Sequence, residues 1–216
     1  MIRIFIIEDN VLTSLGLKHL LQSKYPDYSL AGYAKDLNSA AVAINNKAPD
    51  VILLDLYLGR LDPILNFKSI KEQFSRIPVV ILSSETTLPW KWRMMLEGAS
   101  GYFEKGYNYE ELISALNRVV AGEQVIPDEL DAFIRYFHLP DGIQSFSAAD
   151  LDLVRMRKEG KRMKEIAVHL GKSVHGVEKQ CMKICRMLNL GNMDSVIKCF
   201  YGLDMGLSTF GGDFPH

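Results

Sequence analysis

Five short apolar segments, each followed by a stretch of helical periodicity, constrain the fold of this chain more than any other feature. The segments occupy residues 2–7, 28–34, 51–54, 78–82 and 101–103. Runs of this length are typical of strands buried on both faces, and their alternation with helices favours a parallel sheet. Residues 1–121 are therefore predicted to form an α/β domain, with a five-stranded, mainly parallel sheet between two layers of helices.

The rest of the chain divides by composition and charge. Residues 122–145 hold two prolines and five acidic residues and are predicted to be a linker, with one short helix in "DELDAFIRYF". Residues 146–204 are helical by period, and the segment 155–186 carries ten basic and three acidic residues. Such a surplus of positive charge predicts a polyanionic partner. Residues 205–216 lack periodicity and are expected to be disordered.

Composition also bounds the class of protein. A hydrophobic share of 48% and a charged share of 24% are those of a globular domain. No apolar run approaches the roughly 20 residues of a spanning helix, and the apolar start is too short for a signal peptide. We therefore expect cytoplasmic residence, no membrane contact and reduced thiols at Cys181, Cys185 and Cys199. Cys181 and Cys185 are four residues apart, which leaves a metal or redox pair open, although Cys181 falls on an apolar stripe.

Polar or charged residues follow four of the five predicted strands. Glu8 and Asp9 follow the first strand, Asp55 ends the third, Ser83 follows the fourth and Lys105 lies just past the fifth. Because the ends of parallel strands meet at one edge of a sheet, these side chains are expected to converge.

The predicted cluster suits phosphoryl chemistry. Carboxylates close together repel one another unless a cation is bound, and hard oxygen ligands with an open side suit Mg²⁺. Asp55 could then attack a phosphoryl donor and become an aspartyl phosphate, with Lys105 beside a phosphoryl oxygen. Taken singly, Glu8 or Asp9 is equally consistent with a helix cap, and Lys105 is consistent with a solvated surface lysine. The prediction of a phosphoryl site therefore depends on the combination of these residues at the ends of different strands.

The segments "IIEDN", "DVILLDLYL", "PVVILSS" and "GASGYFEKG" resemble the receiver domain of two-component response regulators, which has a flavodoxin-like fold. The resemblance implies that Asp55 accepts the phosphoryl group and that Glu8, Asp9, Asp55 and the backbone of Tyr57 hold Mg²⁺. It further implies that Ser83 follows the phosphoryl group, that Lys105 is the lysine of the site and that Tyr102 is an aromatic switch. A core tyrosine is an equally good interpretation of Tyr102. The chain departs from the family at Gly59 and Gly106, where prolines are usual, and in the order of Asp62 and Pro63.

A second motif lies in the basic segment. In "SVHGVEKQCMKICRML" the apolar residues Val177, Cys181, Ile184 and Leu188 recur at helical spacing, and basic residues occupy the other face. With Ser173 as N-cap and a shorter helix before it, this pattern fits a helix-turn-helix, although a solvated face of a helical bundle is the plainer alternative.

Residues 146–204 resemble the LuxR-type DNA-binding module of NarL/FixJ-family regulators, through "FSAADLDLVRMRKEG", "KEIAVHLGKS" and "VEKQCMKICRMLNL". The resemblance implies a double-stranded DNA partner, and Lys179 and Gln180 are placed to reach base edges. The residues expected at the DNA are Ser173, His175, Glu178, Lys179, Gln180, Met182, Lys183 and Arg186. Gly176, Glu178 and Met182 depart from the family pattern, and Glu178 would repel a phosphate.

The leading hypothesis is a homodimeric transcription regulator that is switched when a sensor histidine kinase phosphorylates Asp55. The main alternative is a protein-interaction switch whose helical module does not bind DNA, or acts independently of phosphorylation. An enzyme that turns over an aspartyl phosphate is disfavoured, because such enzymes need an acid two residues after the nucleophile and Tyr57 stands there. The chain is therefore not expected to be an enzyme.

Overall fold

The computed structural model describes residues 1–59, 62–106 and 109–202, and the chain divides into two compact units. The sheet unit comprises residues 1–86 and 97–127, and the helical unit comprises residues 87–96 together with the described residues 128–202. The expected disordered tail, 205–216, lies outside the described residues.

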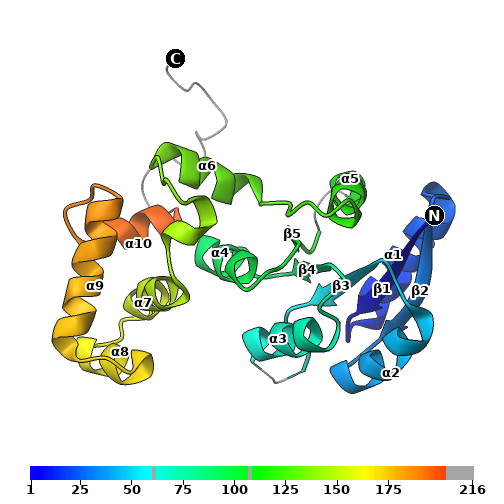
Figure 1. Cartoon of the computed structure of the whole chain (residues 1–216), viewed down its shortest axis with the longest axis horizontal. Helices are drawn as coiled ribbons and strands as arrows, with labels where there is room; N and C mark the ends of the chain where they lie inside the picture. The colour runs from blue at the N-terminus through cyan, green and yellow to red at the C-terminus, as the bar shows by residue number, and fades with distance from the viewer. Residues whose placement is uncertain (60–61, 107–108, 203–216) are drawn as a thin grey trace, which may run out of the picture. The chain divides into compact units, whose positions relative to one another are not determined.

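The sheet unit alternates strands and helices, as the apolar segments predict (Figure 1). Its elements are β1 (Ile2–Ile7), α1 (Val11–Lys24), β2 (Tyr28–Ala34), α2 (Leu37–Lys47), β3 (Val51–Asp55), α3 (Pro63–Gln73), β4 (Val79–Ser83), β5 (Gly101–Glu104) and α5 (Tyr109–Val120). The strand order is β2-β1-β3-β4-β5 and every pairing is parallel, which confirms the predicted α/β class.

The sheet is buried because helices cover both of its faces. Leu17 and Leu21 of α1 and Leu112 and Leu116 of α5 pack on one face, together with alternate strand residues such as Leu53. Helices α2 and α3 lie on the opposite face (Figure 1). The leucines of α1 are not all buried, since Leu21 is 2% exposed whereas Leu12 is 80% exposed.

Strand β2 contains a glycine for a steric reason. The register between β1 and β2 shifts between Ile4 and Phe5, and Phe5 pairs with Gly32. A Cβ atom at residue 32 would lie 2.8 Å from Cε2 of the Phe5 ring, closer than van der Waals contact allows. The glycine therefore admits the Phe5 side chain to the core.

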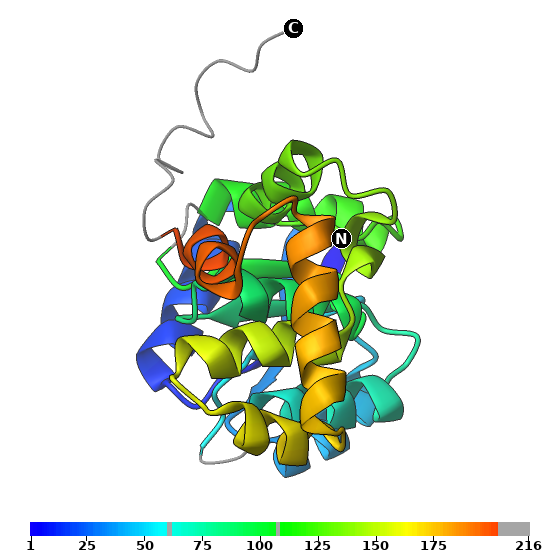
Figure 2. The ribbon, with the colours of Figure 1, turned by 90° about the vertical axis from the view of Figure 1, so that its left-hand side faces the viewer.

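The helical unit consists of α4 (Leu88–Leu96), α6 (Asp128–Tyr136), a 3-10 helix η1 (Gly142–Ser145), α7 (Ala148–Lys158), α8 (Met163–Leu170), α9 (Val174–Met187) and α10 (Met193–Tyr201). Figure 2 turns this unit toward the viewer, with α9 in orange and α7 and α8 in yellow-green and yellow beside it. Within the described part of the chain, no helix has both the length and the apolarity to cross a membrane.

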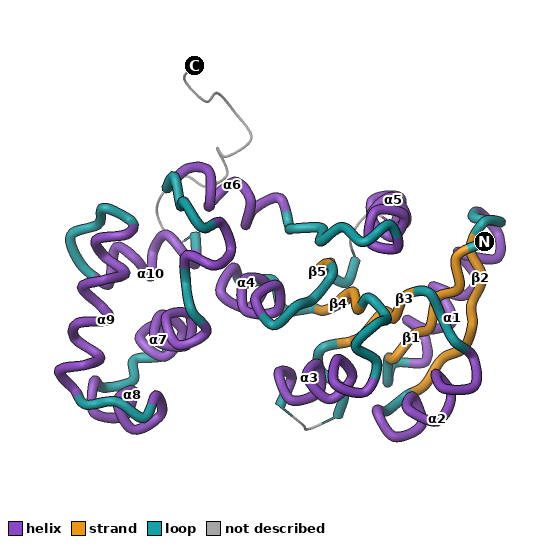
Figure 3. The backbone as a smooth tube through the Cα atoms, viewed as in Figure 1, coloured by secondary structure: helices purple, strands orange, loops and turns teal. Residues whose placement is uncertain are grey.

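The border between the units differs from a simple linker. Val125 forms a parallel bridge with Gly101, and Gln124 Nε2 donates to the carbonyl of Ala99, so residues 122–127 extend the sheet unit. Helix α6, the short helix predicted in the linker, belongs to the helical unit. Helix α4 also belongs there, although it lies between β4 and β5 in the chain (Figure 3). Sequence periodicity does not anticipate that assignment.

Candidate functional site

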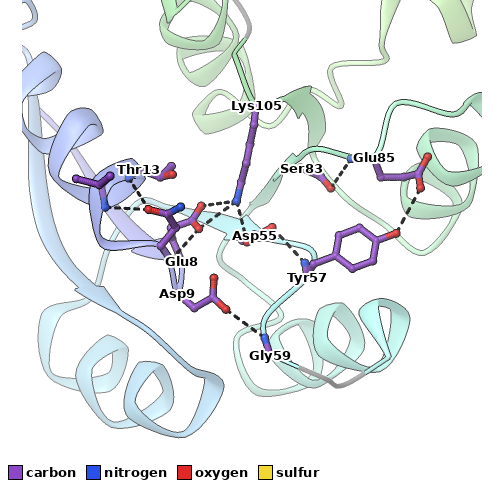
Figure 4. Close-up of polar contacts among 11 residues, drawn as sticks. Glu8, Asp9, Thr13, Asp55, Tyr57, Gly59, Ser83, Glu85 and Lys105 are labelled. Carbon is purple, nitrogen blue, oxygen red and sulfur yellow. Dashed lines mark hydrogen bonds and ion pairs between the residues drawn. The ribbon is translucent and has the colours of Figure 1, made fainter.

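Three carboxylates converge at the carboxyl edge of the sheet, as the strand-end argument predicts (Figure 4). Glu8 and Asp9 follow β1 and Asp55 ends β3, and each offers an oxygen such that the three atoms lie within 4.8 Å of one another. Glu8 and Asp55 are buried, whereas Asp9 is exposed. The cluster therefore has an inner side enclosed by protein and an outer side open to solvent.

Lys105 from the end of β5 neutralises the inner side of this cluster. Its Nζ lies 2.8 Å from Asp55 Oδ2 and 2.8 Å from Glu8 Oε2. Burial alone would lower the pKa of Lys105, but the hydrogen bonds from Nζ to Asp55 and Glu8 outweigh it, and the pKa is raised. The lysine is thus a fixed positive charge between two carboxylates, not a solvated surface residue.

Burial also decides the protonation of Glu8. Desolvation raises the pKa of its carboxyl above the ordinary 4.5, the hydrogen bond from Lys105 lowers it, and the charge of Asp55 raises it again, with a net increase. A carboxylate in this state gains from a second cation nearby. The donor set therefore fits a hard divalent cation such as Mg²⁺.

The end of β4 forms a chain of hydrogen bonds leading away from the acidic cluster. Ser83 is fully buried, and its Oγ accepts a bond of 3.1 Å from the amide of Glu85. The hydroxyl of Tyr102 donates to the carbonyl of Glu85 at 2.7 Å, and the hydroxyl of Tyr57 donates to Glu85 Oε2 at 3.4 Å. Burial raises the pKa of Tyr102, which stays neutral and remains a donor. Glu85 is thus the residue that joins the other three.

The loops around the site explain the departures from the family pattern. Gly59 has φ +64° and Gly106 has φ +93°, a conformation that a proline ring cannot adopt. The amide of Gly59 donates to Asp9 Oδ2 at 3.3 Å, while Asp62 caps α3 and Pro63 is its first residue. Each substitution therefore fits the local backbone, and the backbone of Tyr57 lies beside Asp55, its amide donating to Oδ1 at 3.1 Å.

Helix α9 has the predicted buried stripe, since Val177, Cys181, Ile184 and Leu188 are buried. Ser173 caps the helix, and its Oγ accepts from the amide of Gly176 at 3.1 Å. A Cβ atom at residue 176 would approach that Oγ to 3.3 Å, so glycine leaves room for the cap. The exposed residues of the predicted DNA-facing set are Ser173, His175, Glu178, Lys179, Met182, Lys183 and Arg186.

Gln180 is not on the exposed face and does not fit the prediction that it reaches base edges. It is 7% exposed, and its Nε2 donates to Asp150 Oδ1 at 2.9 Å. Lys183 Nζ also lies 2.9 Å from Asp150, at Oδ2. Burial would raise the pKa of Asp150, but hydrogen bonds from Ser147, Lys183 and Gln180 outweigh it and lower the pKa. Asp150 therefore fixes α9 against the start of α7.

Sequence reasoning missed three groups of residues in and around these sites. Glu85 belongs to no recognisable sequence motif, and only its hydrogen bonds in the structure reveal its position in the network. Asp150 stands three residues after Ser147, a spacing that signals a capping box, but its bonds to α9 depend on tertiary packing. The third group comprises Lys91, Trp92 and Arg93 of α4, for which the sequence gives no signal beyond helical periodicity.

The sheet unit matches a known protein family. The family model described as the response regulator receiver domain matches residues 4–117. The response regulator UvrY of Escherichia coli K12 is 23% identical over 195 residues, covering 88% of this chain and 89% of UvrY. The transcriptional regulatory protein LiaR of Bacillus subtilis 168 is 25% identical over 197 residues, covering 89% of this chain and 93% of LiaR.

Solved structures share the fold over nearly the whole length. RcsB from Salmonella enterica serovar Typhimurium, bound to promoter rprA in the presence of the phosphomimetic BeF3−, is 20% identical with a TM-score of 0.56. That match covers 92% of this chain and 98% of the RcsB chain. A structure of two RcsB dimers bound to two parallel DNAs is 17% identical, with a TM-score of 0.61 and coverage of 92% and 97%.

Proposed function

Because the chain belongs to the response regulators, we propose that it is a DNA-binding transcription regulator switched by phosphorylation of Asp55. The observation that carries the proposal is the position of Asp55 at the end of a buried strand, 2.8 Å from Lys105 and beside Glu8 and Asp9. A nucleophile, a fixed positive charge and two further carboxylates are the groups that aspartyl phosphorylation requires.

In the proposed reaction the Asp55 carboxylate attacks the phosphorus of a phosphohistidine on a partner sensor kinase. A P–O bond to Asp55 forms, the P–N bond breaks, and the released imidazole takes up a proton. Lys105, already paired with Asp55 Oδ2, then pairs with an oxygen of the transferred phosphoryl group. The Tyr57 amide, which donates to Oδ1, holds the carboxylate in orientation.

Glu8, Asp9, Asp55 and the backbone of Tyr57 are the residues that would hold Mg²⁺. The bound cation would offset the negative charge of the carboxylates and of the phosphoryl oxygens. The exposed side of the cluster at Asp9 leaves room for the donor. Glu8 supports the assignment, because burial raises the pKa of its carboxyl in spite of the hydrogen bonds from Lys105 and from the Asn10 amide.

Mg²⁺ affinity is expected to depend on pH through Glu8. Since the folded pKa of Glu8 is raised above 4.5, this carboxyl takes up a proton at a higher pH than an ordinary glutamate, and the proton competes with the cation. Calorimetric titration of the full chain with Mg²⁺ should show affinity falling on acidification, beginning above pH 4.5. Glu8→Gln should bind more weakly and lose this component. An identical pH profile in the variant would assign the proton to another group.

Ser83 and Tyr102 are proposed to carry the signal out of the site. A phosphoryl group on Asp55 attracts the Ser83 hydroxyl, which now accepts a bond from the Glu85 amide. Because Tyr102 is bonded to the carbonyl of the same residue, the segment 83–86 changes as a unit.

The DNA surface is proposed on the exposed side of α9, where Lys179 and Arg186 remain available for phosphates and Ser173 and His175 stand at the start of the helix. His175 Nδ1 lies 3.5 Å from Glu178 Oε2, so a protonated His175 would offset the acid that otherwise repels DNA. Gln180 and Lys183 act here by holding α9 through Asp150.

The function is tested by selecting duplexes from a random DNA pool at several salt concentrations, with and without beryllofluoride and Mg²⁺. Enrichment of one sequence that changes with beryllofluoride in the native chain, and not in Asp55→Ala, is the expected result. Selective binding that ignores both perturbations would remove the phosphoryl switch and keep the DNA function. No binding in any state would leave the protein-interaction switch as the better function.

A matched pair of lysine variants locates the surface in the same assay. Lys179→Ala should lower the magnitude of the salt-dependence slope by about one, since one phosphate contact is lost. Lys47→Ala removes an exposed lysine of the sheet unit and should leave the slope unchanged. Equal slopes in the two variants would move the DNA surface away from α9. The chain is further proposed to bind DNA as a homodimer, as RcsB does in the structure of two RcsB dimers on two parallel DNAs, and to reside in the cytoplasm.

A further inference from the structure

Helix α4 is encoded between two strands of the receiver yet is a core helix of the helical unit. The chain leaves the sheet unit after Thr86 and returns to it at Glu97. Between these points α4 packs chiefly against α6, η1, α7 and α10. The assignment of α4 to the helical unit therefore follows from its contacts there.

Three consecutive side chains of α4 each contact a different element of this unit. Lys91 Nζ lies 3.4 Å from Glu129 Oε2 of α6, and Trp92 Nε1 donates to the carbonyl of Ile143 in η1 at 2.7 Å. Arg93 forms an ion pair of 2.9 Å with Asp152 Oδ2 of α7. Since successive residues of an α-helix are about 100° apart, these contacts span about 200° of its circumference. More than half of the helix surface is thus enclosed by the unit.

Trp92 is the centre of the aromatic core of the helical unit. Its side chain is fully buried, and its ring lies 5.6 Å from Phe133, 5.0 Å from Phe146 and 5.9 Å from Phe200, between centroids. Phe133 belongs to α6, Phe146 precedes α7 and Phe200 belongs to α10. One side chain of α4 therefore contacts aromatic rings from three other segments of the unit, and Phe200 also packs directly against Phe133 and Phe146.

The amino-terminal end of α4 follows closely, along the chain, on the segment that is hydrogen-bonded to Ser83 and Tyr102. Glu85, whose amide and carbonyl are bonded to Ser83 and Tyr102, stands one residue before Thr86, the last residue of the sheet unit on this side. A rearrangement of this segment would displace the first turn of α4. Because α4 is packed in the core, it must either resist that change or carry the core with it.

We propose that α4 is a shared core helix that transmits the state of Asp55 into the packing of the DNA-binding unit. The inference rests on the proposed function and adds the path by which the receiver controls the helical unit. Trp92, Lys91 and Arg93 are positioning residues in this scheme, and none of them touches the phosphoryl group or the DNA.

Tryptophan fluorescence of the full chain tests this path, because the two tryptophans of the sequence, Trp90 and Trp92, both lie on α4. Trp90→Phe leaves Trp92 as the single probe. Trp92 is fully buried, so rearrangement of its core should raise acrylamide quenching and shift its emission to longer wavelength when beryllofluoride and Mg²⁺ are added. The same variant carrying Asp55→Ala should show no change.

Fluorine NMR of the same samples separates the two ways in which the idea can fail. Bound beryllofluoride with unchanged Trp92 emission would overturn the role of α4 and leave the phosphorylation site intact. No bound beryllofluoride in the Trp90→Phe chain or the native chain would overturn the proposed function, and this inference with it.

A double-mutant cycle on the Arg93–Asp152 pair provides the second test. Arg93→Ala and Asp152→Ala should each reduce the ratio of DNA affinities with and without beryllofluoride by roughly 3- to 30-fold, and the double variant no further. The control is Arg118→Ala, which removes an ion pair of 2.8 Å with Glu123 on the sheet unit. Additive losses, or an equal loss in the control, would contradict transmission through α4.

Discussion

Replacing Asp55 by asparagine is expected to abolish covalent phosphorylation of the chain. The amide has nearly the size and shape of the carboxylate, but it is not a nucleophile that can form an acyl phosphate. Asp55 is 5% exposed, and the structure shows it paired with Lys105 and bonded to the Tyr57 amide. Intact-mass spectrometry after incubation with acetyl phosphate and Mg²⁺ should detect the phosphorylated species in the native chain only.

The matched control for this experiment is Asp50→Asn. Asp50 precedes β3, at the opposite end of the strand, where its Oδ2 accepts from the amide of Arg3 at 2.7 Å. This variant should be phosphorylated like the native chain. The Asp55→Asn chain should keep nearly its native melting temperature, because the relief of repulsion among the three carboxylates offsets the loss of the ion pair with Lys105. Phosphorylation that survives in Asp55→Asn would move the acceptor to a different residue.

Trp92→Ala is expected to destabilise the helical unit by about 3–5 kcal/mol, as for other buried large-to-alanine changes. The substitution leaves a cavity among Phe133, Phe146 and Phe200 and leaves the carbonyl of Ile143 without its donor. For a chain of this size the melting temperature should fall by roughly 10 °C, as measured by far-ultraviolet circular dichroism.

The neighbouring tryptophan gives the comparison. Trp90 lies on the same helix and is only half-buried, so Trp90→Ala should cost much less. A melting temperature for Trp92→Ala as high as that for Trp90→Ala would mean that the aromatic cluster does not depend on α4.

The sheet and the acidic cluster follow from the sequence because both depend on simple periodicities. Short apolar runs identify buried strands, and parallel pairing brings Glu8, Asp55, Ser83 and Lys105 to one edge without any detail of side-chain packing. The buried stripe of α9 is predicted correctly for the same reason. The domain boundaries and the individual roles of the site residues remain predictions.

The errors arise where tertiary contacts override a local pattern. Gln180 lies beside the basic face of α9 in a helical projection, yet a buried carboxylate on α7, Asp150, draws its amide inward. Helix α4 is amphipathic like any receiver helix, and nothing in "LPWKWRMML" states which unit its apolar side will join. That choice depends on Phe133, Phe146 and Phe200, which lie 41 to 108 residues further along the chain than Trp92.

The placement of α4 bears on how such a protein can be cut and recombined. A chimera joined in the linker would combine the DNA-binding helices of this protein with a foreign α4, whose side chains were selected against different partners. The core of the helical unit would then lack the indole ring of Trp92, which bonds to η1, and the guanidinium of Arg93, which pairs with α7. The helical unit is therefore discontinuous in sequence. A hybrid protein must include residues 87–96 together with the carboxyl-terminal helices for this unit to fold and respond.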